Sequence, residues 1–200
     1  MGMDHMTVGF ALTGSYCTFD KVIPQVLDFV KKGHDVHVIV SENVQHTDTR
    51  FGKSIDFMER LKKITGNPLI TSIREAEPIG PKNFLDCLII APCTGNTLSK
   101  LANGITDTCV TMAAKATLRN KNPLILAIST NDGLSGSARS LGTVLNYKNV
   151  YFVPFRQDEY MKKETSLVAE MTKIYDTFAA AINGQQLQPL LLEGKTAQTK

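Results

Sequence analysis

Short apolar runs alternate along the chain with longer stretches in which apolar residues recur every three or four positions. Short runs bounded by turn-forming residues are typical of buried strands, whereas the three-to-four-residue period is typical of helices with one buried face. The runs predict strands over residues 8–12, 36–40, 85–90, 123–128 and 150–153, with an edge-like strand over 69–73. The periodic stretches predict helices over residues 19–32, 54–65, 98–102, 108–118, 136–145 and 166–182.

This alternation predicts one fold class. Strands that are apolar throughout and separated by helices are typical of a parallel sheet covered on both faces. With right-handed crossovers, the result is a doubly wound, three-layer α/β/α domain with a Rossmann-like parallel sheet of about six strands. Ligands bind at the carboxyl ends of the strands in such folds. In chain order, with residues 69–73 as the third strand, the loops after the first, second, fourth (85–90) and fifth (123–128) strands are expected to form one site.

The domain is predicted to span residues 7–184, and residues 185–200 are predicted to form a C-terminal tail. Residues 1–6 contain three methionines and no apolar core, so we interpret them as a tag or disordered start and exclude them from the fold.

Composition narrows the functional classes. Hydrophobic residues make up 42% of the 200 residues, charged residues 20%, and the formal net charge is +3. There is no polybasic tract to favour nucleic acid, and no apolar stretch of the roughly 18 residues that would span a membrane. With no signal segment, the cytoplasm is the expected compartment. The four cysteines form no C-x-x-C pair, so no metal site is predicted and reduced or buried thiols are expected.

The first two loops carry small polar side chains. The sequence has neither G-x-G-x-x-G nor G-x-x-x-x-G-K-[ST], so it lacks the common dinucleotide and P-loop signatures. Gly14 allows close approach of a ligand to the backbone, and the hydroxyls of Thr13 and Ser15 could bind phosphate oxygens near a helix N-terminus. After the second strand, Ser41 and Asn43 offer another hydroxyl and an amide. A turn with capping hydroxyls explains these residues equally well.

The loop after the predicted strand over residues 85–90 matches a longer and more specific sequence pattern. Residues 91–107, APCTGNTLSKLANGITD, resemble the A-P-x-[ST]-[AG]-N-T-x-x-K-x-A-x-G-x-x-D run of the homo-oligomeric flavin-containing cysteine decarboxylase family. The resemblance extends over about residues 8–155. It implies an FMN-binding, doubly wound domain and a homo-trimer or an assembly of trimers. It also implies that Gly14, Ser15 and Ser41 hold the phosphate and ribityl end of FMN, and that Ser129 and residues Thr94, Gly95, Asn96 and Thr97 contact the flavin. Asn43, beside Ser41, is a further candidate for cofactor binding.

Two departures separate the chain from the decarboxylases of that family. Their catalytic histidine would fall at Pro78, and no histidine follows His46. Their P-x-M-N segment corresponds to residues 128–131, of which only Asn131 is kept. A cysteine decarboxylase is therefore disfavoured.

A finer resemblance, through residues 49–52, 76–81, 112–119, 129–132, 152–155 and 186–189, is to family members that act within a two-subunit enzyme. It implies a partner subunit of NAD(P) type and a small dicarboxylate substrate of dihydropyridine type. Flavin-dependent oxidation is then the first hypothesis. A non-oxidative FMN enzyme and a non-catalytic stabilising subunit stay open as alternatives.

A dicarboxylate substrate calls for cations or amides near the flavin. Asn131 is a candidate because the family motif places it, and Arg50 and His46 because they follow the second loop. Further arginines that could serve are Arg119, Arg139 and Arg156. Solvated side chains or structural ion pairs explain each arginine, and a solvent-exposed loop position explains His46, without any function.

Overall fold

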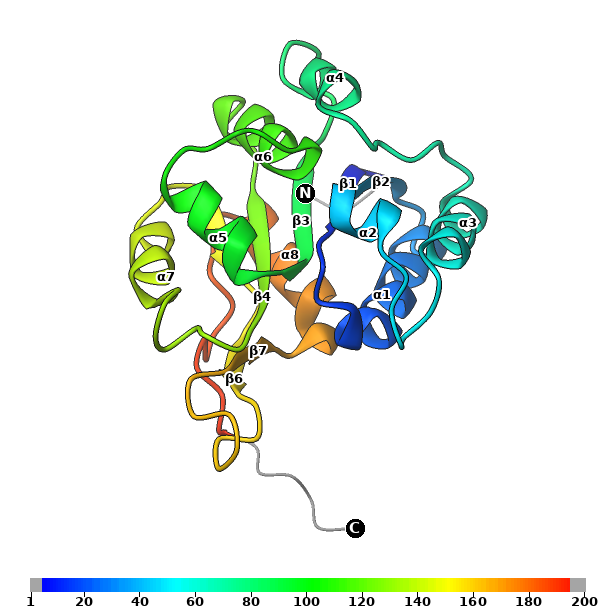
Figure 1. The fold of residues 1–200 in the computed structure, drawn as a ribbon. Helices are drawn as coiled ribbons and strands as arrows, with labels where there is room; N and C mark the ends of the chain where they lie inside the picture. Colours follow the sequence, from blue (N-terminus) through cyan, green and yellow to red (C-terminus); the bar gives the residue numbers. More distant parts are fainter. Residues whose placement is uncertain (1–4, 195–200) are drawn as a thin grey trace.

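A seven-stranded sheet runs through the protein, of which the computed structural model describes residues 5–194. The strand order is β2-β1-β3-β4-β7-β6, and β5 pairs with β4 beside this path (Figure 1). The strands are β1 (Thr7–Leu12), β2 (Asp35–Val40), β3 (Cys87–Cys93), β4 (Leu124–Thr130), β5 (Val150–Phe152), β6 (Phe155–Gln157) and β7 (Leu167–Ala169).

The first five strands form the predicted parallel sheet. Val8 of β1 lies opposite Val36 of β2 on one side and Cys87 of β3 on the other, and β4 pairs in parallel with both β3 and β5. Every residue of β3 is buried, as is every residue of β4 except Thr130. Burial on both faces is the reason that these strands are apolar throughout.

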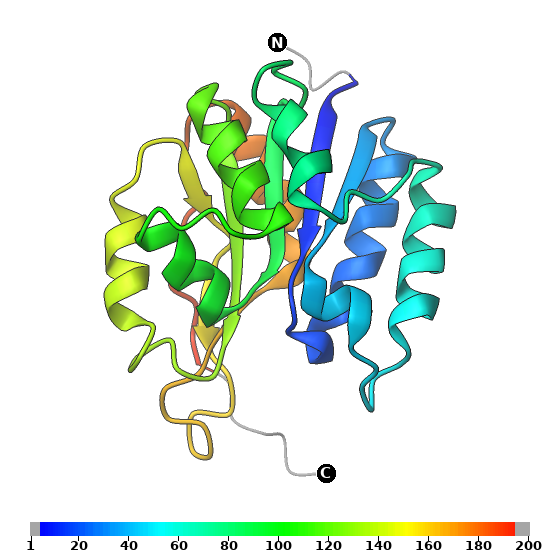
Figure 2. The ribbon, with the colours of Figure 1, turned by 45° about the horizontal axis from the view of Figure 1, so that its top comes forward.

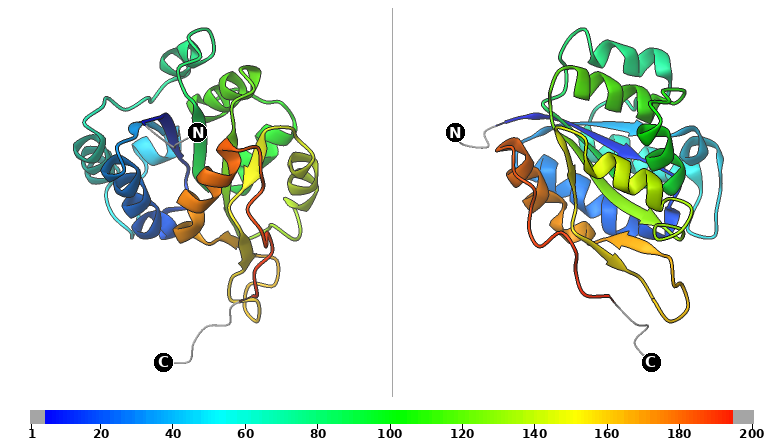
Figure 3. Two further views of the ribbon diagram at one scale, coloured as in Figure 1. Left: turned by 180° about the vertical axis from the view of Figure 1, so that it is seen from behind. Right: turned by 90° about the vertical axis from the view of Figure 1, so that its left-hand side faces the viewer.

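Helices cover both faces of the sheet. Figure 3 shows α1 and α8 on one face and α4 and α6 on the other, and Figure 2 shows α5 and α6 in front of the strands with α8 behind them. The α-helices are α1 (Phe19–Lys31), α2 (Glu42–His46), α3 (Ser54–Thr65), α4 (Ile73–Ala76), α5 (Gly95–Ala102), α6 (Cys109–Arg119), α7 (Ala138–Leu145) and α8 (Ile174–Ile182). Three single 3-10 turns accompany them: η1 (Tyr16–Thr18), η2 (Glu77–Ile79) and η3 (Met171–Lys173). The three-layer prediction is confirmed.

Aromatic side chains join the first face to its helices. Phe29 of α1 makes edge-to-face contacts with Phe10 of β1 and Phe178 of α8, with ring centroids 5.6 and 5.0 Å apart. All three rings are fully buried. Such pairs add to the free energy gained by burial alone, so they fix α1 and α8 against the sheet.

The last part of the sheet differs from the prediction. The expected helix over residues 166–182 is wrong in its first half, because Leu167–Ala169 forms β7, which pairs antiparallel with β4 and β6. Glu170 then takes an extended conformation, and the helix begins only at Ile174. Leu167 and Ala169 are buried in sheet pairing, and three residues are too few to show a period of two.

The expected strand over residues 69–73 is also wrong. Ile70 makes a single parallel bridge to Ile39 at the edge of β2, and Ile73 already belongs to α4. Ser72 and Glu75 form a capping box that starts this helix, so the local capping hydrogen bonds end the extended segment.

Both chain ends contact the domain where they are described. The backbone N–H of Asp35 donates to the Met6 carbonyl, and the amide group of Gln186 hydrogen-bonds both backbone groups of Phe152. Residues 1–4 and 195–200, within the predicted start and tail, lie outside the described residues. None of the helices formed by residues 5–194 combines the length and the hydrophobicity needed to cross a bilayer.

Candidate functional site

Two adjacent cavities lie at the carboxyl edge of the parallel strands. The larger has a volume of about 530 Å³ and the smaller about 120 Å³. Gly14, Thr94 and Asn96 line both, so the loops after β1 and β3 form the wall between them. The larger volume lies within the usual range for small-molecule sites. The loops after β2 and β4 supply the outer walls, as expected for a doubly wound sheet.

All nine residues predicted to bind the cofactor line one or both cavities. Ser15, Gly95 and Ser129 line the larger one, and Ser41, Asn43 and Thr97 line the smaller one. The structure therefore brings the four loops together around two adjoining cavities.

Hydrogen bonds between the loops hold this region in shape. The Ser15 and Ser129 hydroxyls lie 2.7 Å apart and join the loops after β1 and β4. The Thr13 hydroxyl donates to the Pro92 carbonyl at 2.7 Å and accepts from the Thr94 N–H at 3.1 Å, which joins the loops after β1 and β3. Since Thr13 and Ser129 are buried, these bonds are shielded from water.

The N-terminus of α5 forms part of the shared wall. Thr94 is the N-cap, and its hydroxyl accepts from the Thr97 N–H at 3.4 Å. Gly95 leaves room for its neighbours: a β-carbon there would lie 2.5 Å from Ser137 Oγ and 2.8 Å from Asp132 Oδ1. Asp132 in turn accepts hydrogen bonds from the Thr130 and Ser137 hydroxyls. Because Thr94 and Asn96 line both cavities, the positive end of the α5 dipole faces them.

Ser41 carries an unsatisfied polar atom. Its hydroxyl oxygen is buried and has no hydrogen-bond partner among the described residues, and it lines the smaller cavity. It precedes α2 at the N-cap position but does not cap the helix. An unpaired buried hydroxyl is unfavourable by about 1–3 kcal/mol, so this atom is suited to a polar ligand group.

A positive charge reaches the smaller cavity from α5. Lys100 lines it and forms an ion pair with Asp107 at 2.8 Å. The hydrogen bond from Lys100 lowers the pKa of the Asp107 carboxyl below its ordinary value. Lys100 and the neighbouring hydroxyls give this cavity the donors that a phosphate or a polyol needs.

The three candidates for catalysis lie in different places. Asn131 lines the larger cavity, and its backbone carbonyl accepts from the Thr165 hydroxyl at 2.7 Å. Arg50 and His46 line neither cavity and are exposed; the Arg50 guanidinium lies 4.9 Å from the centre of the Phe51 ring.

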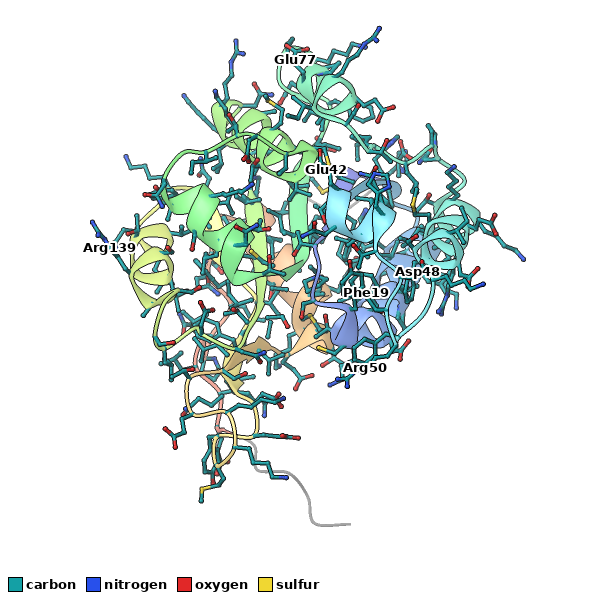
Figure 4. The ribbon with its side chains drawn as sticks, viewed as in Figure 1. Phe19, Glu42, Asp48, Arg50, Glu77 and Arg139 are labelled. Carbon is teal, nitrogen blue, oxygen red and sulfur yellow. The ribbon has the colours of Figure 1, made fainter. Side chains whose placement is uncertain are left out.

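The other three candidate arginines, Arg119, Arg139 and Arg156, also line neither cavity. Arg156 forms an ion pair with Glu170 at 2.9 Å, and Arg119 lines a separate groove beside α6. Arg139 projects from α7 to the outside of the molecule (Figure 4).

Sequence reasoning missed several residues that line the larger cavity. They are Cys17, Thr18, Lys21, Thr130, Asp132, Asp158, Lys163, Ser166, Leu167 and Val168. Lys21 lies in the first turn of α1, directly after the first loop, and this position could have indicated it. The residues from Asp158 onward come from the β6–β7 hairpin and its loop, which the sequence did not predict, because no element was expected over residues 154–165 and a helix was expected from residue 166.

The cysteines show no ligand cluster. Cys87, Cys93 and Cys109 are buried and Cys17 is exposed, all as free thiols. Burial raises the pKa of Cys93 to about 12 and that of Cys109 to about 11, so both thiols stay protonated at neutral pH. Within residues 5–194, no three histidine, cysteine or acidic side chains gather as a metal site.

Comparison with known proteins gives a consistent assignment. The sequence model of the Flavoprotein family matches residues 2–179. The B subunit of dipicolinate synthase from Bacillus subtilis (strain 168) is 48% identical over 186 residues, which are 93% of each chain. The crystal structure of the dipicolinate synthase B subunit from Bacillus halodurans C has a TM-score of 0.89 and 47% identity, and the match covers 98% of this chain and 100% of that one.

A more distant structure shares the fold. DmrB from Burkholderia xenovorans, solved in complex with FMN, has a TM-score of 0.65 at 17% identity over 92% of this chain and 98% of its own. Because the family match spans most of the sequence and two relatives of similar length are nearly half identical, the chain belongs to the Flavoprotein family.

Proposed function

We propose that this chain is the flavoprotein (B) subunit of a dipicolinate synthase. It would act with the A subunit of that enzyme, of NAD(P) type, to oxidise a dihydrodipicolinate-type precursor to pyridine-2,6-dicarboxylate during sporulation, in the cytoplasm of the mother cell. The observation that carries this proposal is 48% identity to a dipicolinate synthase B subunit over 93% of both chains. Sequence identity of this extent supports a shared role more strongly than fold likeness does.

The residues at the sheet edge fit FMN. The unpaired Ser41 hydroxyl, Asn43 and Lys100 line the smaller cavity and offer polar groups to a phosphate or a ribityl chain. The larger cavity, bounded by Ser15, Ser129 and the α5 N-terminus, has room for a planar ring system. When bound, FMN would accept a hydride as the dihydropyridine ring becomes aromatic.

The contribution of the protein is placement. The hydrogen bond between Ser15 and Ser129 fixes the separation of two walls, and Thr13 fixes a third. Fixed walls hold two reactants in one orientation, which lowers the barrier by removing the entropy cost of alignment. Asn131, at the rim of the larger cavity, would donate its amide N–H to a substrate carboxylate.

We also infer that the chain forms a homo-trimer, or an assembly of trimers, in complex with the NAD(P)-type partner. Sedimentation of the purified chain with and without that partner tests this, and a monomer in both samples would contradict it.

The first experiment is the absorption spectrum of the purified complex of the two proteins, before and after substrate is added without oxygen. Flavin bands that bleach during turnover are expected. A colourless complex that still makes product would leave this chain a stabilising subunit. Flavin bands that stay unchanged during a non-oxidative conversion would indicate a decarboxylase or prenyltransferase type of enzyme.

A further inference from the structure

Four charged residues line the larger cavity, and they differ in their ion-pair partners. Its lining includes two basic residues, Lys21 and Lys163, and two acidic ones, Asp132 and Asp158. Lys21 comes from the first turn of α1 and Lys163 from the loop between β6 and β7. Two elements far apart in the sequence thus each bring one lysine to the lining of the same cavity.

The two acidic residues differ in how they interact with the two lysines. Asp132 accepts hydrogen bonds from the Thr130 and Ser137 hydroxyls within the wall, and no ion pair joins it to either lysine among the described residues. Asp158 instead forms an ion pair with Lys163 at 3.0 Å, and Glu159 lies 3.9 Å from the same ammonium. Lys163 is therefore held in position by partly exposed carboxylates.

Lys21 has no such partner. No ion pair joins it to any residue among 5–194, and it is exposed at the cavity. An unpaired ammonium at a cavity wall can bind an incoming anion without first breaking another contact. The arginines that were expected to bind carboxylates lie elsewhere, as described above.

We infer that Lys21 and Lys163 form the subsite that binds the two carboxylates of a small dicarboxylate in the larger cavity. Asp158 holds Lys163 in place when the cavity is empty, and a substrate carboxylate competes with it for the ammonium. This inference rests on the proposed function for the presence of a dicarboxylate, and it assigns the selectivity for that substrate class to two residues that the family motif does not include.

The test uses pyridine-2,6-dicarboxylate as the probe with Lys21→Gln, Lys163→Gln and the double variant. Lys162→Gln is the matched control, since it removes the same charge from the neighbouring exposed position, which does not line the cavity. Binding is measured by calorimetry on the full chain, with and without FMN. A charge-assisted hydrogen bond contributes roughly 1.5 kcal/mol or more, so each single variant is expected to weaken binding about tenfold.

A monocarboxylate gives a second measurement. Pyridine-2-carboxylate has one carboxylate and can bind only one of the two lysines. Its affinity is therefore expected to fall in one of the two single-lysine variants and to stay unchanged in the other. The double variant is expected to weaken dicarboxylate binding by about the product of the single effects, because the two lysines bind separate carboxylates.

The outcomes separate this inference from the proposed function. Dicarboxylate affinity that is equal in the wild type, the lysine variants and the control would overturn it, as would the absence of binding by the wild-type chain. Failure of the chain to bind FMN would contradict the proposed function alone, because the calorimetry without FMN still tests the lysines.

Discussion

At the scale of single residues, the site depends on one absent side chain and one unpaired hydroxyl. Gly95 has no side chain, and Ser137, Thr130 and Asp132 fill the space that a β-carbon would take. The Ser41 hydroxyl is buried and has no hydrogen-bond partner among the described residues. The family resemblance implied that both residues bind the cofactor, but only the packed structure gives the physical reason for each position.

Gly95→Ala is expected to destabilise the protein by about 1–3 kcal/mol, because the added methyl group must displace buried hydroxyl and carboxylate groups. Gly142→Ala is the control. Gly142 lies within α7 and has no atom within 4 Å of the position of an added β-carbon, so alanine is expected to stabilise the helix by roughly 0.5–1 kcal/mol. Urea titration followed by circular dichroism measures both, and equal effects of the same sign would contradict the packing argument.

Ser41→Ala is expected to lower FMN affinity about fivefold to tenfold, because a hydrogen bond contributes about 1 kcal/mol and more when the partner is charged. The free energy of unfolding without FMN should stay the same or rise, since the substitution removes an unpaired buried group. Fluorescence titration with FMN and urea unfolding give the two values. Ser54→Ala in α3, which lines neither cavity, should leave FMN affinity unchanged.

At the scale of elements, the strands with the longest apolar runs were predicted within one to three residues at each end, as were most of the helices. The β6–β7 hairpin was not. Its strands are three residues each, too short for a period to be read, and Leu167–Ala169 continues an apolar pattern that suits a helix equally well. The pairing of Ser129 with Val168 decides the strand, and that contact joins residues 39 positions apart.

Thr13 joins two elements, so its substitution tests how far the loops depend on each other. Thr13→Val keeps the shape but leaves the Pro92 carbonyl and the Thr94 N–H without their partner, and a loss of about 1–3 kcal/mol in unfolding free energy is expected. Thr13→Ser keeps both bonds and should restore most of it. Thr143→Val in α7, where the hydroxyl bonds only the Arg139 carbonyl of its own helix, is the control and should have a small effect. Equal losses in the two valine variants would contradict the coupling of the loops.

At the scale of the whole molecule, His34 connects the start of the chain, β2, α1 and α8. It is buried, with ring contacts to Phe29, Tyr175 and Phe178. Its Nδ1 accepts from the Met6 N–H at 3.4 Å, so it must carry no proton there. Burial lowers the pKa of His34 below its ordinary value, and the nearby charges of His5 and Lys32 act in the same direction.

The sign of the pH dependence follows from that direction. The unfolded chain binds a proton at His34 near its ordinary pKa of about 6.5, whereas the folded protein binds it only at lower pH. Folding stability from this group is therefore complete above about pH 6.5 and falls as the pH decreases below it. His34→Gln should reduce the slope of unfolding free energy between about pH 7.5 and 5.5, measured by urea titration. An unchanged slope in His34→Gln would contradict the prediction.

The sequence by itself determined the parallel sheet, its covering helices and the loop ends that carry polar side chains. These follow from local patterns, because a buried strand must be apolar. A strand-to-helix turn favours a small residue such as Gly14 or a capping residue such as Thr94. The tertiary structure alone decided which cations reach the larger cavity and that Ser41 lacks a partner among the described residues. Lys21 and Lys163 are 142 positions apart, and no local pattern can state that two such side chains share one cavity, because that depends on how the whole chain packs.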